Sequence, residues 1–217
     1  MTAMQARKSK TPEIARPNAE SIARAARLIA EGRIVAIPTE TVYGLAVDAA
    51  NEAAVETLYI AKGRPAEKPF VVQFDSVPAA IEWASLSGPA RRLADAFWPG
   101  PLTLIVRAPA GRELAHGVTA GGATIGIRIP HNPVALDVLR AAGRPLAVTS
   151  ANLSGEPGAR SADEIPASVR NHVALILDGG PCPIGVASTV LDVTSERFRI
   201  LRQGTLTADD IEKALKA

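Results

Sequence analysis

Three cations lie close together in the first third of this 217-residue chain. Lys62, Arg64 and Lys68 stand among one glycine and two prolines, which disfavour a helix, and an apolar strand is expected directly after them over residues 70–74. We therefore expect the cations on a stiff loop that is anchored to this strand. A planar guanidinium with ammonium groups nearby suits an anion such as phosphate. The alternative is a solvated surface loop.

Hydroxyl and amide groups gather where two other expected strands end. Strand 33–38 leads into the polar segment 39–45, and strand 145–150 leads into a segment that contains Asn152 and Ser154. Ligands of open α/β sheets bind outside the carboxyl ends of strands, so both segments are candidates for a binding site. The same residues also suit ordinary turns, in which Ser and Asn bond to their own backbone.

The expected strand 124–130 has two chemically different faces. Three isoleucines alternate with Thr124, Gly126 and Arg128, so one face is typical of a core and the other carries a guanidinium. A glycine beside that guanidinium would leave room for a ligand. An ordinary solvent-facing side of a sheet is the alternative.

These residue types favour phosphoryl or nucleotidyl transfer more than hydrolysis. The sequence has no phosphate-loop, dinucleotide-binding, zinc-protease or nucleophile-elbow motif, and its three histidines stand far from any candidate nucleophile. Transfer from ATP depends on positioning and charge stabilisation, with Mg²⁺ carried by the nucleotide. The candidate groups are Thr41, Lys62, Arg64, Lys68, Arg128, Thr149, Ser150, Asn152, Ser188 and Arg202.

The composition indicates one globular domain, with 47% hydrophobic and 21% charged residues. A net charge of +2 does not favour nucleic-acid binding through bulk charge. The single cysteine, Cys182, excludes an intrachain disulfide and a zinc site built from thiolates. No apolar stretch is long enough to span a membrane and no signal peptide is apparent, so we expect a cytoplasmic protein.

Periodicity and capping residues place these groups among alternating helices and strands. We expect a flexible basic arm over residues 1–17, one catalytic domain over 18–217 and a mobile loop over 108–123. Helices are expected near 19–31, 52–61, 77–84, 89–97, 133–142, 163–170 and 208–216. The remaining strands are expected at 102–107, 173–178, 188–193 and 198–203.

Several short motifs resemble, in order, those of the YrdC-like family, and the resemblance covers roughly residues 20–205. They are Pro38–Leu45, Lys62–Pro65, Trp98–Leu104, Gly126–Pro130, Thr149–Gly155, Ala187–Val190 and Ile200–Gly204. The resemblance implies a single α/β domain with a twisted, open, mixed parallel and antiparallel sheet, flanked by helices, and a concave basic groove. It also implies the short form of the family, without a second C-terminal domain.

The activity implied by the resemblance is L-threonylcarbamoyladenylate synthesis. L-Threonine, bicarbonate and ATP would give threonylcarbamoyl-AMP and pyrophosphate, in the first step of the t6A modification of tRNA. Mg²⁺ would travel with ATP, and Ser150, Ala151 and Asn152 would meet the nucleotide and its metal, although no metal ligand is assigned to the protein. Partners would be downstream tRNA threonylcarbamoyl-transfer proteins, with weak direct binding of tRNA or other RNA and no membrane.

The resemblance also implies roles for individual residues. The catalytic group would be Lys62, Arg64, Ser150 and Asn152. Threonine would be bound by Thr41, Gln73, Arg128, Thr149 and Ser188. The nucleotide would be bound by Lys62, Arg64, Lys68, Thr124, Ser150, Ala151, Asn152 and Arg202.

Two positions depart from the family pattern, and other functions stay open. Gln73 stands where many members have histidine, and the segment 157–160 replaces a hydroxyl-containing one that contacts nucleotide. The alternatives are an RNA-binding module, a carbamoyl-transfer domain that uses carbamoyl phosphate, and a family member that binds nucleotide without catalysis. Scarce aromatic residues argue against the first, and the single cysteine argues against the second.

Overall fold

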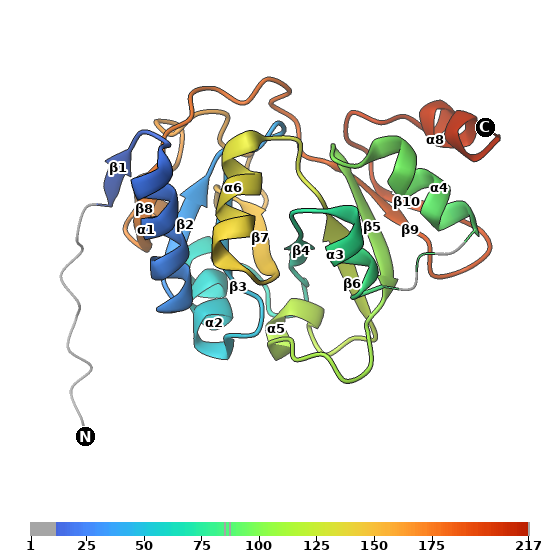
Figure 1. The fold of residues 1–217 in the computed structure, drawn as a ribbon, viewed down its shortest axis with the longest axis horizontal. Helices are drawn as coiled ribbons and strands as arrows, with labels where there is room; N and C mark the ends of the chain where they lie inside the picture. The colour runs from blue at the N-terminus through green and yellow to red at the C-terminus, as the bar shows by residue number, and fades with distance from the viewer. Residues whose placement is uncertain (1–11, 85, 87, 217) are drawn as a thin grey trace.

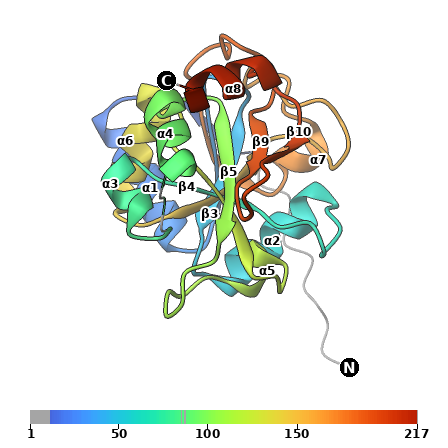
Figure 2. The same cartoon turned by 90° about the vertical axis from the view of Figure 1, so that its right-hand side faces the viewer.

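The structure is a computed structural model that describes residues 12–84, 86 and 88–216. These residues form one mixed α/β sheet with helices on both sides, as expected (Figures 1 and 2). In sheet order the ten strands are β1 (Glu13–Ala15), β8 (Val173–Leu177), β2 (Ile34–Ile37), β3 (Gly44–Asp48), β7 (Leu146–Ser150), β4 (Val71–Gln73), β6 (Thr124–Arg128), β5 (Leu102–Arg107), β9 (Thr189–Asp192) and β10 (Arg199–Arg202).

The helices cover the two sides of the sheet unevenly. Figure 2 shows α1, α3, α4 and α6 on one side and α2, α5 and α7 on the other, while α8 packs beside α4. The helices of the described residues are α1 (Ala19–Ala30), α2 (Glu52–Lys62), α3 (Val77–Ile81), α4 (Gly88–Phe97), α5 (His116–Thr119), α6 (Pro133–Ala142), α7 (Ala167–Arg170) and α8 (Ala208–Lys216).

Strand order brings the two polar segments of the sequence together. β3 pairs antiparallel with both β2 and β7, and Gly44 lies opposite Ile37 on one side and Ser150 on the other. The amide of Ala151 donates to the carbonyl of Tyr43 at 2.8 Å. Segment 39–43 and the loop after β7 are therefore neighbours, although about a hundred residues separate them.

The core explains why the short strands hold their register. All residues of β2 are buried, and they alternate between two hydrophobic clusters. Ile34 joins the larger cluster, whereas Val35 joins a second cluster between the sheet, α1 and α6. A slip by one residue would exchange these environments, so the register is strongly specified.

Helix ends follow the signals in the sequence. Asn18, Asn51 and Asn132 cap the first turns of α1, α2 and α6 through their side-chain oxygens. Gly63 and Gly143 end α2 and α6 in the left-handed conformation, which glycine adopts without strain. The predicted positions of these three helices are therefore confirmed.

Two short strands were not predicted from the sequence. β3 begins at the end of the polar segment 39–45, and its Leu45 and Val47 are buried like residues of a core strand. Residues 1–11 of the expected arm lie outside the described residues. A flexible arm is wrong for Glu13–Ala15, because this stretch forms β1 and pairs in parallel with β8.

Two other expectations need correction. The stretch 108–123 was expected to be a loop, and this is wrong for His116–Thr119, because these residues form α5 and Val118 is fully buried against the core. The helix expected at 163–170 is reduced to α7, because Pro166 occupies its N-cap position and the preceding residues form turns. No helix within the described ranges is long and apolar enough to cross a membrane.

Candidate active site

A pocket opens where β3, β4, β5, β6 and β7 approach the segments before β3 and β9. Three arginines, Arg64, Arg128 and Arg202, line it together with hydroxyl and amide groups. The other lining residues are Thr39, Thr41, Val42, Tyr43, Gly44, Pro69, Phe70, Val71, Gln73, Thr103, Val148, Thr149, Ser150, Ala187 and Ser188. No acidic side chain of the described residues lines this pocket.

Arg128 is the most constrained of the three arginines. Its side chain is 6% exposed, and its Nη2 donates to Oε1 of Glu40 at 2.6 Å and to Oγ1 of Thr41 at 3.0 Å. Its Nε donates to the carbonyl of Gly100 at 3.2 Å. Nη1 makes no hydrogen bond to any described residue, so this nitrogen remains for a ligand.

Arg64 and Arg202 are held in the same way by backbone carbonyls. Arg64 donates from Nε to Lys68 at 3.0 Å and from Nη2 to Pro69 at 2.9 Å, and it lies over the Phe70 ring. Arg202 donates from Nε and Nη2 to the carbonyl of Ser188 at 3.1 and 2.9 Å. In both, Nη1 again makes no hydrogen bond within the described part of the chain.

The three guanidinium groups are close enough to influence one another. Burial is the main cause that lowers the pKa of Arg202, and the positive charges of Arg128 and Arg64 lower it further. Burial also lowers the pKa of Arg64. An anion in the pocket would relieve this repulsion, because each guanidinium stays charged at neutral pH.

A hydrogen bond between two hydroxyl groups determines whether Thr41 can donate to a ligand or accept from it. Thr39 and Thr41 share a hydrogen bond of 2.8 Å between their Oγ1 atoms, and the Thr39 hydroxyl donates to the carbonyl of Val42 at 2.7 Å. Since Thr39 has a single hydroxyl proton, Thr41 must be the donor in the shared bond. Thr41 then accepts from Arg128 and can offer a ligand only an acceptor lone pair.

Gln73 carries an unused hydrogen-bonding group at the pocket wall. Its side chain is buried, and Oε1 has no hydrogen-bond partner among the described residues. Buried polar atoms are normally paired, so a ligand donor is the simplest partner for it. On another wall, the hydroxyls of Ser188 and Thr103 lie 2.9 Å apart, and Arg202 Nη2 donates to Ser188 at 3.2 Å.

Lys62 packs against the loop that follows β7. It was expected on a stiff loop, but it is the last residue of α2 and is 2% exposed. Its Nζ donates to the carbonyls of Ser150 at 2.5 Å and Asn152 at 2.6 Å, with Asn152 Oδ1 at 3.4 Å. Burial, together with the nearby charge of Arg64, lowers the pKa of Lys62 to about 8.

The structure brings together some of the predicted site residues and separates others. Eight line the pocket, namely Thr41, Arg64, Gln73, Arg128, Thr149, Ser150, Ser188 and Arg202. The pocket lining does not include Lys62, Lys68, Thr124, Ala151 and Asn152. Lys68 is exposed, and Thr124 begins the strand that Arg128 ends. Asn152 is buried and donates to the carbonyls of Leu153 and Glu156.

The ligand space expected beside Gly126 does not exist. A Cβ atom at this glycine would lie 3.2–3.4 Å from side-chain atoms of Ile105, Thr103 and Val71. These neighbours fill the space, so the glycine serves close packing of three strands. The other face of the strand is not solvent-exposed, because Arg128 is 5% exposed.

Three residues of the candidate site lie in segments that the sequence analysis pointed to but were not singled out there. Glu40, Thr39 and Thr103 all contact residues that line the site, and two of them line it themselves. A carboxylate inside a segment of otherwise uncharged residues was a usable signal, since buried charges are normally paired. Its partner lies 88 residues away, which no local pattern reveals.

Comparison with known families assigns the chain to one class. The family model Sua5/YciO/YrdC, described as "Telomere recombination", matches residues 27–204. The chain therefore belongs to the Sua5/YciO/YrdC family.

Individual relatives share much of the sequence and the fold. A threonylcarbamoyl-AMP synthase of Bacillus subtilis is 42% identical over 202 residues, covering 91% of this chain and 57% of the relative. A Mycobacterium tuberculosis relative is 39% identical over 196 residues, covering 89% of this chain and 88% of the relative. The crystal structure of Pyrococcus abyssi Sua5 complexed with L-threonine superimposes with a TM-score of 0.87 at 38% identity, covering 94% and 60% of the two chains. The chain thus spans little more than half of the Bacillus and Pyrococcus proteins.

Proposed function

We propose that this chain is a threonylcarbamoyl-AMP synthase, which converts L-threonine, bicarbonate and ATP into threonylcarbamoyl-AMP and pyrophosphate. The observation that carries the proposal is the convergence of Arg64, Arg128 and Arg202 in one pocket, each with Nη1 unbonded to the described residues. Family membership and the printed names of the relatives support the choice of reaction.

The pocket offers acceptors and donors in the pattern that an amino acid requires. Thr41 and Gln73 Oε1 are acceptors that suit the ammonium or hydroxyl group of threonine. Arg128 Nη1 is a donor that suits its carboxylate. Thr149 and Ser188 complete the proposed threonine contacts.

ATP would occupy the side of the pocket that contains Arg64 and Arg202. Uncompensated guanidinium groups suit a polyphosphate, and Mg²⁺ would enter with the nucleotide. Within the described ranges, no group of three or more His, Cys, Asp or Glu side chains could hold a metal ion. The proposed nucleotide contacts further comprise Lys68, Thr124, Ser150, Ala151 and Asn152, and Lys62 would act on the nucleotide through the loop after β7 that it holds.

The proposed chemistry has two bond-forming steps. The threonine amine reacts with bicarbonate to give a carbamate and water. A carbamate oxygen then attacks the α-phosphorus of ATP, and the bond to the β-phosphate breaks to release Mg²⁺-pyrophosphate. The protein contributes proximity and charge stabilisation, and we assign no general base. The product would pass to tRNA threonylcarbamoyl-transfer proteins in the cytoplasm.

Pyrophosphate release tests the proposal. The purified chain is incubated with MgATP, threonine and bicarbonate, and each of the last two is omitted in turn. The proposal predicts release only when both are present. Release that ignores threonine would overturn it, as would turnover of carbamoyl phosphate in place of threonine and bicarbonate. RNA binding that falls steeply with salt, without ATP turnover, would favour the RNA-binding alternative.

A further inference from the structure

One arginine of the pocket is held differently from the other two. Arg64 and Arg202 rest on neutral backbone carbonyls, whereas Arg128 rests on the carboxylate of Glu40. A carbonyl would hold the guanidinium equally well in geometric terms. Removing a carboxylate from water is unfavourable, so its presence beside Arg128 calls for an explanation. Unlike a carbonyl, the carboxylate also balances the positive charge of Arg128 at its corner of the pocket.

Glu40 is fixed behind the pocket and does not line it. Its side chain is 6% exposed, and its backbone carbonyl accepts from the amide of Ile184 at 2.9 Å. Oε2 has no hydrogen-bond partner among the described residues. The carboxylate therefore cannot be explained as an anchor for several backbone groups, and its contact within the described residues is Arg128.

The pairing divides the pocket into two electrostatic halves. The positive charges of Arg64 and Arg202 have no carboxylate partner among the described residues. The positive charge of Arg128 is balanced by Glu40 at 2.6 Å. A ligand with several negative charges is therefore favoured at the first half, whereas the second half offers it a donor without net positive charge.

We propose that Glu40 determines the anion selectivity of the Arg128 corner, so that this corner accepts a carboxylate with one negative charge and rejects phosphate groups. Glu40 works against the wrong ligand, because it cancels the positive charge that a phosphate group would need, and such discrimination against a competitor is a common source of specificity. The identity of the carboxylate as that of an amino-acid substrate rests on the proposed function. The rejection of phosphates does not rest on it.

Binding of inorganic pyrophosphate tests this selectivity without any turnover. Calorimetry with wild type and the Glu40→Gln variant compares a carboxylate with a neutral amide that still accepts from Arg128. We expect Glu40→Gln to bind pyrophosphate roughly tenfold more tightly, or to gain a second site, because one repulsive charge near the ligand is removed. The double variant Glu40→Gln/Arg128→Met should lose this gain.

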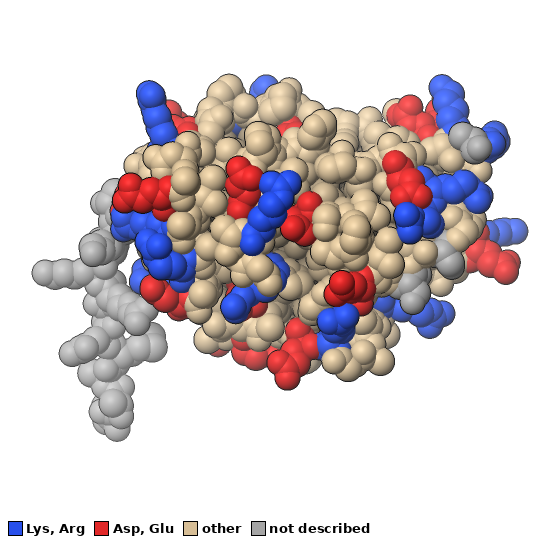
Figure 3. All heavy atoms as spheres, in the orientation of Figure 1, with Lys and Arg blue, Asp and Glu red and all other residues tan. Residues whose placement is uncertain are grey.

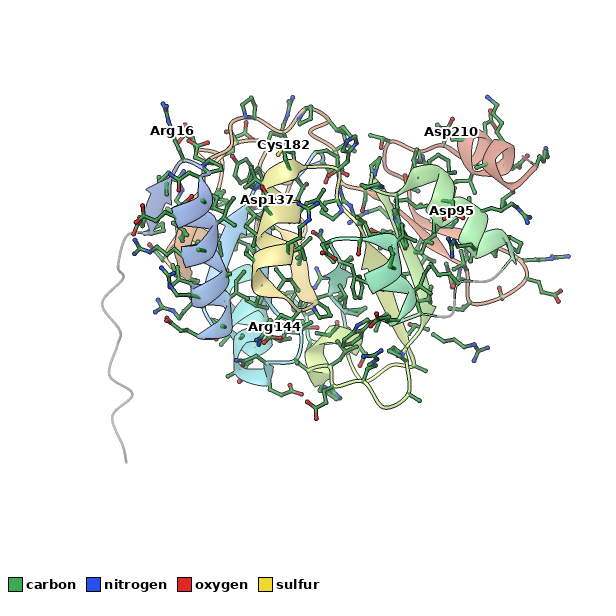
Figure 4. All side chains as sticks on the ribbon, in the orientation of Figure 1. Arg16, Asp95, Asp137, Arg144, Cys182 and Asp210 are labelled. Atoms are coloured by element: carbon green, nitrogen blue, oxygen red, sulfur yellow. The ribbon has the colours of Figure 1, made fainter. Side chains whose placement is uncertain are left out.

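A matched control separates this effect from a general change of charge. Asp48 forms a partly buried ion pair with Arg144 at 2.8 Å, at the far end of β3 from the pocket. Figure 4 shows Arg144 at the end of α6 opposite to Cys182, whose loop packs against Glu40. Asp48→Asn removes the same charge there and should leave pyrophosphate affinity within about twofold of wild type.

Three results would overturn the inference. They are unchanged pyrophosphate affinity in Glu40→Gln, a gain that persists without Arg128, and an equal gain in Asp48→Asn. If Glu40→Gln fails to fold, the phosphonate analogue of threonine serves as a probe of wild type, which should bind it at least about tenfold more weakly than threonine. Equal binding of the two would also overturn the inference. Failure of threonine-dependent pyrophosphate release alone would contradict the proposed function and leave the selectivity result standing.

Discussion

Lys62 and Arg128 are both cations that the fold removes from solvent, with exposed fractions of 2% and 5%. Lys62 directs its ammonium group at three oxygen atoms of the protein, so it has no donor left for a ligand. Arg128 spends Nε and Nη2 on the protein and keeps Nη1. Burial of a charge therefore does not identify a ligand contact, whereas an unspent donor next to a pocket does.

Exposed charged side chains differ from these two buried cations. On the face seen in Figure 3, acidic and basic side chains are interspersed. Exposed ion pairs include Arg91 with Asp95 and Arg140 with Asp137. Exposed pairs of this kind contribute little to stability. The charges assigned to the proposed function are those of the arginines that line the pocket.

Replacement of Arg64 should give the largest loss of activity. Arg64→Ala should reduce kcat/KM for ATP by about 100-fold, because it removes a fixed charge from the phosphate side of the pocket. The melting temperature should change little, since Arg64 is only partly buried. Arg64→Lys should recover little activity, because lysine lacks the second nitrogen that the loop carbonyls hold. Near-normal turnover of the alanine variant would remove Arg64 from the site.

Replacement of Lys62 should mainly affect stability. Lys62→Met leaves the carbonyls of Ser150 and Asn152 without their donor, and we expect a loss of roughly 1–3 kcal/mol in the free energy of unfolding. Urea titration measures this loss, and the exposed Lys213→Met provides the control. A phosphate contact would instead appear as a raised KM for ATP with unchanged stability, which would contradict the role of Lys62 as a support of the loop.

Lys62 should also impose a pH dependence on stability. Burial lowers its pKa from 10.5 to about 8, so between these values the unfolded chain binds more protons than the folded chain. The free energy of unfolding attributable to Lys62 should therefore rise as the pH increases from about 8 to 10.5. The difference between wild type and Lys62→Met across this range isolates the effect, and a flat difference would contradict it.

Replacement of Gln73 should give the smallest effects, and stability and substrate affinity should change in opposite directions. Gln73→Leu removes a buried oxygen that lacks a partner, so stability should stay constant or rise by up to about 1 kcal/mol. The KM for threonine should rise roughly tenfold if the ligand supplies the missing partner. Gln73→His, which restores a polar side chain, should recover part of the affinity. An unchanged KM in Gln73→Leu would exclude this contact.

The sequence predicted local structure well and spatial relationships poorly. Asn18, Asn51 and Gly63 marked helix ends correctly, because capping depends on neighbouring residues. β1 was missed because only three residues pair with a strand far along the chain. β3 was missed because it is short and begins inside a polar segment.

The same limit applies to the site. Arg64, Arg128 and Arg202 were all predicted, and they meet in one pocket. What local patterns cannot show is how each group is used: Lys62 donates to the carbonyls of Ser150 and Asn152, and Glu40 accepts from Arg128. Both depend on partners 88 to 90 residues away.

Incorporation of labelled bicarbonate tests most directly whether the chain makes threonylcarbamoyl-AMP. The chain is incubated with MgATP, L-threonine and carbon-13-labelled bicarbonate, and the nucleotide products are analysed by mass spectrometry. We expect a threonylcarbamoyl-adenylate that carries the label and disappears in the Arg128→Met variant. Hydrolysis of ATP to AMP without a labelled adenylate, in the presence of all three substrates, would contradict it.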